Sequence, residues 1–156
     1  MKRLVLVLAL LLAGCYEVAQ EVIPAAAGIE LPIQSPITWD DGGRTEFTWV
    51  ETTGDYRFVD KDGETGSARG IHIRDDLYLI QVRYDSEATY GLYFFVITPS
   101  RIDMVLPIDT VDDLAARYGV TLSDDDAGEF DYVLGGSPEN ILAFLRAHAE
   151  LEFDVP

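Results

Sequence analysis

The sequence predicts an α+β fold in which an antiparallel β meander carries one or two helices from the C-terminal part of the chain. Between Trp39 and Leu106, apolar and polar residues alternate with a period of two, and clusters of Asp, Gly and Ser interrupt the alternation at short intervals. Beyond Leu106, helix-capping residues and helical spacing replace this alternation. We therefore expect a curved sheet or partial barrel of six or seven strands, with the helices packed on it.

The strands of the meander follow from the alternation in chain order. In the first of them Phe47 and Trp49 stand two positions apart, and the turn Asp75-Asp76 precedes the fourth. In the fifth, 90–98, the run from Leu92 to Ile97 is apolar at every position, so both faces of this strand should be covered. The expected strands are 44–51, 56–58, 71–74, 77–84, 90–98 and 101–106, and 130–134 is a further candidate.

Two segments near the C-terminus carry helix signals and are the expected cover of the sheet. Thr110 with Asp113 three positions later resembles a capping box, and a helix over 111–118 would end before Gly119. The second helix, about 137–150, has the stronger signals. It starts with Ser137 as N-cap, Pro138 at the first helical position and Glu139 in the first turn, and its apolar-leaning stripe is Ile141, Phe144, Leu145 and His148.

The first fifteen residues form a separate unit. Lys2 and Arg3 precede an apolar run, 4–12, that consists of Leu, Val and Ala. At about 1.5 Å per helical residue this run covers roughly half of a bilayer core of about 30 Å. It is too short for a transmembrane helix and has the length of the apolar region of a signal peptide.

The four residues Leu12-Ala13-Gly14-Cys15 end this unit, and they resemble the lipobox of bacterial lipoproteins. The resemblance implies a signal peptide over 1–14, cleavage before Cys15, and lipidation of Cys15 with a diacylglycerol and fatty acids such as palmitate. Two or three acyl chains hold a protein stably on a membrane, whereas one does so only marginally. In that family an Asp after the cysteine often retains the protein at the inner membrane. Tyr16 stands there in this chain, so we expect an outer-membrane protein facing the periplasm.

The residues after Cys15 suggest a spacer. Pro24, Pro32 and Pro36 interrupt any regular pattern, and we expect a lipidated tether over 15–35 followed by a single α+β domain over 36–156. The alternative is that 29–33 packs as an edge strand.

The chain is strongly acidic. Its formal net charge is −17, and removal of residues 1–14 takes away Lys2 and Arg3 but no acid, which changes the net charge to −19. Nucleic-acid binding is disfavoured because phosphate contacts require clustered Lys and Arg. The acidity serves solubility or, alternatively, recognition of a cationic partner or divalent ions.

No catalytic or metal-binding constellation stands out. The only histidines are His72 and His148, and no serine lies in a Gly-x-Ser-x-Gly context. The loops 60–64 and 124–128 contain alternating or consecutive acids but fail the ligand spacing of a calcium-binding EF-hand loop. We expect no cofactor, no metal and no enzymatic activity.

Aromatic residues concentrate in the meander, where a cupped sheet could hold a small amphipathic molecule. The alternative is that they serve core packing and cross-strand pairing. The residues that we expect to face a ligand are Trp49, Tyr56, Tyr78, Tyr84 and Tyr93.

These observations favour a lipid-anchored envelope protein whose periplasmic domain binds a protein partner or a small ligand without catalysis. A first alternative is an acidic inhibitor of, or protective factor against, a cationic periplasmic enzyme. A second is a hydrolase that uses carboxylates, although with 28 acidic residues in the chain any carboxylate spacing can be found.

Overall fold

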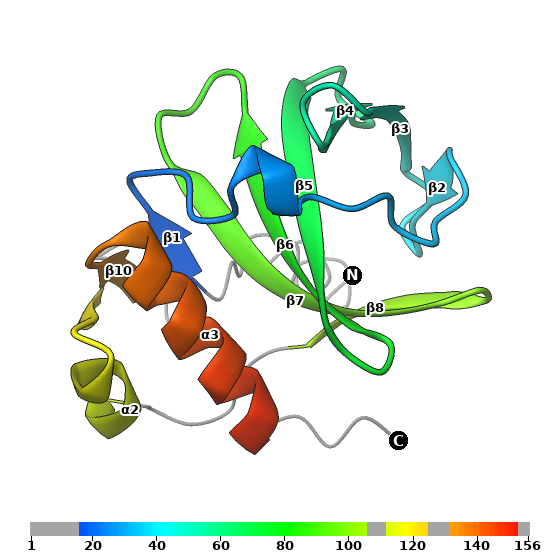
Figure 1. The fold of residues 1–156 in the computed structure, drawn as a ribbon. Helices are drawn as coiled ribbons and strands as arrows, with labels where there is room; N and C mark the ends of the chain where they lie inside the picture. The colour runs from blue at the N-terminus through cyan, green and yellow to red at the C-terminus, as the bar shows by residue number, and fades with distance from the viewer. Residues whose placement is uncertain (1–15, 106–111, 125–131, 153–156) are drawn as a thin grey trace, which may run out of the picture.

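The computed structural model describes residues 16–105, 112–124 and 132–152, and it shows an α+β fold (Figure 1). Ten strands form one open, curved sheet in the order β2-β3-β4-β5-β6-β7-β1-β10-β9, with β8 also paired to β7. The strands are β1 (Tyr16–Val18), β2 (Ile37–Thr38), β3 (Arg44–Val50), β4 (Asp55–Val59), β5 (Thr65–Arg74), β6 (Leu77–Tyr84), β7 (Tyr90–Thr98), β8 (Arg101–Val105), β9 (Thr121–Asp124) and β10 (Tyr132–Gly135). The helices are the 3₁₀ turn η1 (Ala25–Ala27), α2 (Asp112–Arg117) and α3 (Pro138–Glu152).

The predicted meander is confirmed. Each strand from β2 to β8 pairs antiparallel with the next strand along the chain. The tight turn between β5 and β6 is the predicted Asp75-Asp76, and Asp75 adopts a positive φ of 45°, which Asp tolerates better than most residues. The sheet has ten strands rather than six or seven because β1, β2 and β9 contain only two to four residues, too few for an alternating pattern to be recognised.

The prediction of a tether over 15–35 is wrong for the described part of that segment. β1 lies inside the sheet, antiparallel to β7 and parallel to β10. Val18 and Ile23 are 0% exposed, and Ile29 forms a β-bridge to Gly70 in β5. The folded domain therefore includes residues 16–35. The alternative edge strand over 29–33 does not form as a strand, because only Ile29 makes a β-bridge.

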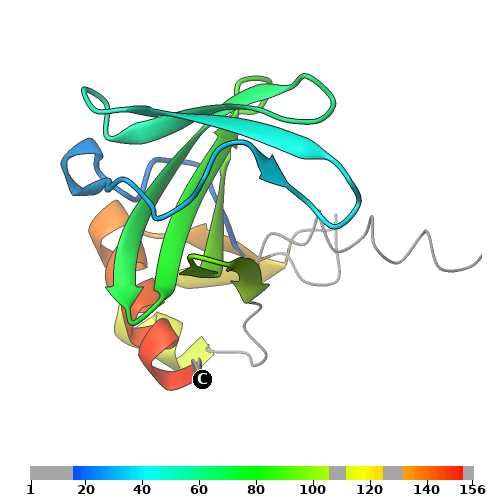
Figure 2. The same ribbon diagram turned by 90° about the vertical axis from the view of Figure 1, so that its right-hand side faces the viewer.

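Two apolar clusters cover the two faces of the curved sheet. The first contains Leu92 and Phe94 of β7 together with the buried residues of α3, and α3 lies across this face in Figure 1. The second contains Ile97 of β7 and the aromatic residues of β3 and β4. These two strands fold over the other face (Figure 2). The apolar strand 90–98 is thus covered on both faces, as predicted.

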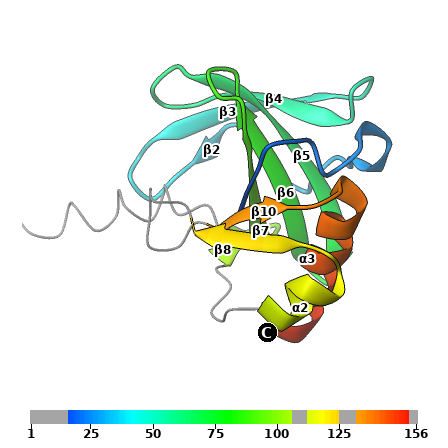
Figure 3. The same ribbon diagram turned by 90° about the vertical axis from the view of Figure 1, so that its left-hand side faces the viewer.

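The C-terminal helix forms as its capping signals predict. The Ser137 hydroxyl accepts a hydrogen bond from the backbone N–H of Asn140 at 3.2 Å, and Pro138 is the first residue of α3. The predicted stripe is buried, with Ile141, Phe144, Leu145 and His148 each 0–1% exposed. The shorter helix α2 packs beside β9, as Figure 3 shows, and ends before Gly119, which has a φ of 66°. The predicted cap Thr110 lies outside the described residues.

Candidate functional site

Polar side chains from neighbouring strands line up on one face of the sheet. The register places Arg57 of β4 opposite Ser67 of β5, and Ser67 opposite Arg83 of β6. One step along the strands, Arg69 of β5 lies opposite Gln81 of β6. Because side chains alternate between faces, these residues share the face that carries α3. The small serine between two arginines leaves space above the sheet.

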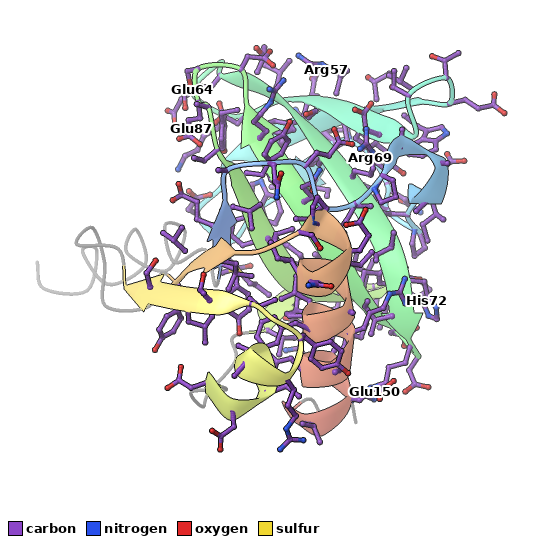
Figure 4. All side chains as sticks on the ribbon, turned by 60° about the vertical axis from the view of Figure 1, so that its left-hand side comes forward. Arg57, Glu64, Arg69, His72, Glu87 and Glu150 are labelled. Carbon is purple, nitrogen blue, oxygen red and sulfur yellow. The ribbon has the colours of Figure 1, made fainter. Side chains whose placement is uncertain are left out.

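This space is a polar hollow with a volume of about 140 Å³. Glu21, in the segment between β1 and η1, lines one side, or wall, of the hollow, and Tyr90 of β7 also lines it. Figure 4 shows Arg57 and Arg69 at one end of the sheet, away from His72 and Glu150 at the other end. The residues that line the hollow are Glu21, Asp55, Arg57, Ser67, Arg69, Gln81, Arg83 and Tyr90.

Arg69 ties three parts of the chain together beneath the hollow. Its guanidinium donates to the backbone carbonyls of Ile23 at 2.7 Å, Thr53 at 3.2 Å and Gly54 at 3.2 Å. It also pairs with the carboxylates of Glu21 and, at 3.5 Å, Asp55. Burial lowers the pKa of the Arg69 guanidinium from its ordinary value. The five acceptors compensate this buried cation, so its role is to hold the wall of the hollow in place.

Gln81 fixes the same wall from the neighbouring strand. Its side-chain oxygen accepts hydrogen bonds from the backbone N–H groups of Val22 at 2.6 Å and Ile23 at 3.0 Å. These two donors would otherwise be buried without partners, which is costly. The segment after β1 is therefore held against the sheet by side chains of β5 and β6.

Arg57 stands at the rim of the hollow and is already paired. It donates to the carboxylate of Asp85 at 2.6 Å, and the hydroxyl of Thr65 donates to the same oxygen at 2.7 Å. The Thr65 hydrogen bond, followed by that from Arg57, lowers the pKa of Asp85 below its ordinary value. Both side chains of this ion pair are exposed, so salt screens it.

Arg83 differs from the other two arginines. Its guanidinium carbon lies 5.3 Å from the centre of the Tyr90 ring, in the range of a cation–π contact. Among the described residues it forms no ion pair, and its buried Nε has no hydrogen-bond partner. The hollow therefore contains one half-buried cation without a direct ion pair among the described residues, and together with the Thr65 hydroxyl and Arg57 its charge helps to lower the pKa of the Asp85 carboxyl.

The five predicted aromatic residues lie elsewhere. Trp49, Tyr56, Tyr78 and Tyr84 belong to the second apolar cluster, and Tyr93 packs beside Phe95 at a ring distance of 6.3 Å. Burial raises the pKa of the Tyr56 hydroxyl, which accepts a hydrogen bond from the Leu31 N–H at 2.9 Å. None of the five lines the hollow, and their contact with a ligand stays a prediction.

Neither histidine lines the hollow. His72 is exposed, and its Nε2 lies 2.6 Å from the carbonyl oxygen of Asp75. His148 is 0% exposed, with its Nδ1 2.9 Å from the Tyr16 hydroxyl. In the loop 60–64, the Asp60 carboxylate accepts hydrogen bonds from two backbone N–H groups and stabilises the turn.

Three further observations concern metals and the membrane. Within the described ranges, no group of three His, Cys, Asp or Glu residues could hold a metal ion. The described helices include none that is long and apolar enough to cross a membrane. The predicted lipidation site Cys15 lies outside the described residues.

Comparison with protein-family models, with curated proteins and with solved structures finds no match to this chain. The fold and the hollow define an open, curved β-sheet domain with a charged hollow on its helix-bearing face.

Proposed function

We propose that this chain is a lipid-anchored protein of the bacterial envelope whose domain binds a small polar ligand in the hollow beside Arg69, without catalysis. The observation that carries the binding site is the hollow itself, which is lined by polar side chains from four strands and the N-terminal segment. Small-molecule sites are concave and use convergent polar groups to orient the ligand; this hollow is smaller than a typical site and its lining is mainly polar, so it suits a small polar ligand.

The absence of a catalytic role rests on the partners of the lining residues. Arg69 and Gln81 are used to hold the wall, and the Arg57 guanidinium is paired with Asp85. Neither histidine lies at the hollow, and no lining residue is a paired nucleophile and base. The residues that line the hollow are therefore suited to binding a ligand rather than to proton transfer.

The lipid anchor rests on the leader and Leu12-Ala13-Gly14-Cys15. Cleavage before Cys15 would give a protein attached to the outer membrane with its domain in the periplasm. Replacement Cys15→Ser should abolish incorporation of labelled palmitate and leave the protein unprocessed or soluble. If the Cys15→Ser protein still incorporates palmitate, the anchor is not at this residue.

The binding site has a separate test that uses a filled hollow. Ser67 lies between Arg57 and Arg83, so Ser67→Leu should occupy the space above the sheet. Ser86→Leu, in the exposed turn after β6, is the matched control. A ligand at about 100 times its Kd stabilises a protein by roughly 2.7 kcal/mol. Thermal unfolding with fractionated small molecules from envelope extracts should show such a shift for wild type and Ser86→Leu only. An equal shift for Ser67→Leu would exclude the hollow.

A further inference from the structure

We infer that the ligand of the hollow carries a singly charged carboxylate, which Arg83 binds. This inference rests on the proposed function and names the ligand class of the same site. It starts from the scarcity of cations: the chain has 11 Lys and Arg against 28 Asp and Glu, yet three arginines line one small hollow. Arginine is the side chain suited to planar recognition of carboxylates.

The three arginines are not equivalent. Arg69 is saturated by three carbonyls and two carboxylates, and Arg57 donates to Asp85. Arg83 is the one that forms no direct ion pair with a described carboxylate, and its Nε–H lacks an acceptor among the described residues. A buried N–H without an acceptor is unfavourable, so an acceptor supplied by a ligand would be stabilising.

The Tyr90 ring prepares Arg83 for this role. The ring lies against the guanidinium at 5.3 Å and limits its orientations. A planar group held by an aromatic face loses less side-chain entropy when its N–H edge engages a carboxylate. Ser67, opposite Arg83 in the register, leaves the space that such a carboxylate would occupy and offers a hydroxyl.

The charges around the hollow favour a monoanion over a dianion. Asp85 pairs with Arg57 at the rim, so the three arginines face the three carboxylates of Glu21, Asp55 and Asp85, and these side chains together are neutral. A dianionic phosphate would bring a second negative charge toward these carboxylates, which costs energy. The volume of about 140 Å³ likewise favours a small group.

The test uses the full chain in detergent and three probes of similar size: acetate, acetamide and inorganic phosphate, at constant ionic strength. Nuclear magnetic resonance follows the Nε–H signal of Arg83 together with the backbone signals of β5 and β6. A charge-assisted hydrogen bond corresponds to roughly 10- to 100-fold in affinity. We expect acetate to bind at least about 10-fold more tightly than acetamide or phosphate and to shift the Arg83 signal.

Two variants separate local recognition from general electrostatics. Arg83→Gln should weaken acetate binding at least about 10-fold, whereas Arg101→Gln, which removes the same charge from the exposed β8, should change it less than about 2-fold. Equal losses in the two variants would overturn the inference. So would acetamide or phosphate binding as tightly as acetate, although saturable binding of either at the hollow would leave the proposed function intact. No saturable shift with any probe would overturn both.

Discussion

Replacement of Ile23 by Ala tests whether the segment after Cys15 belongs to the core. The Ile23 side chain is 0% exposed, while its N–H and carbonyl bond to the Gln81 and Arg69 side chains. Alanine keeps both backbone bonds and removes three carbons. At about 0.8 kcal/mol per methylene, the lost transfer energy is roughly 2.4 kcal/mol, and the cavity left behind adds to it. We expect the free energy of unfolding to fall by about 3 kcal/mol, within the range of about 2–5 kcal/mol for buried Ile→Ala changes.

The measurement is urea unfolding followed by the fluorescence of Trp39 and Trp49. The urea concentration at the midpoint of unfolding should fall with little change in the m-value. The melting temperature Tm should fall by about 10 °C for a domain of this size. Ile29→Ala is the matched control, because Ile29 lies in the same segment but is 37% exposed. It should cost less than about 1 kcal/mol. If Ile23→Ala stays within about 0.5 kcal/mol of wild type, or equals the control, the segment is a tether and its packing is refuted.

Three further changes have defined outcomes. Tyr16→Phe removes the hydrogen bond to His148, which is buried, and should cost about 1–2 kcal/mol in urea unfolding; no loss would show that this bond contributes nothing. Arg69→Gln leaves two carboxylates and three carbonyls without their donor. Because the Arg69 side chain is only 9% exposed, this change should lower the free energy of unfolding by about 3–5 kcal/mol; an unchanged free energy in the same assay would contradict the structural role of Arg69. The pKa of Asp85 is lowered in the folded protein, chiefly by the Thr65 hydroxyl. The contribution of Asp85 to the free energy of unfolding is therefore complete above about pH 4 and is lost as the pH falls through the pKa of Asp85 in the folded state. The stability advantage of wild type over Asp85→Asn should therefore shrink on acidification from pH 6 to pH 2, and a constant difference would contradict the shift.

The long strands and the main helix were predictable because their signals are local. β6 and β7 have the predicted bounds, since alternation over eight or nine residues between clear turns leaves little ambiguity. α3 was equally clear, because Ser137 and Pro138 start it and its apolar stripe has helical spacing. In each case the residues that specify the element lie within it.

β1 was not predictable for the opposite reason. Tyr16-Glu17-Val18 is too short to show a period, and nearby prolines suggest a spacer. The strand exists because its partners are supplied by β7 and β10, which are more than 70 and more than 110 residues away. Pairing over such distances is a tertiary effect that overrides local propensity.

The hollow was equally hidden in the sequence. Arg57 and Arg83 each occupy a polar position of an alternating strand, where a solvent-exposed side chain is the usual outcome. Only the register across β4, β5 and β6 places them on either side of Ser67. The sequence did carry one signal for the hollow. Cations are rare in this acidic chain, so arginines on the polar faces of neighbouring strands indicate a specific role.

The position of β1 changes what a lipid on Cys15 would do. Tyr16, the next residue, is 3% exposed, pairs with Leu92 in β7, and lies 2.9 Å from His148 of α3 through its hydroxyl. A lipid at Cys15 would then be joined directly to a central strand, without a spacer. Glu21 at the hollow follows Tyr16 by five residues, which span at most about 17–18 Å of extended chain. The hollow would thus lie close to the lipidated end of the domain, and the domain could not move away from the bilayer without unpairing β1 from β7 and β10.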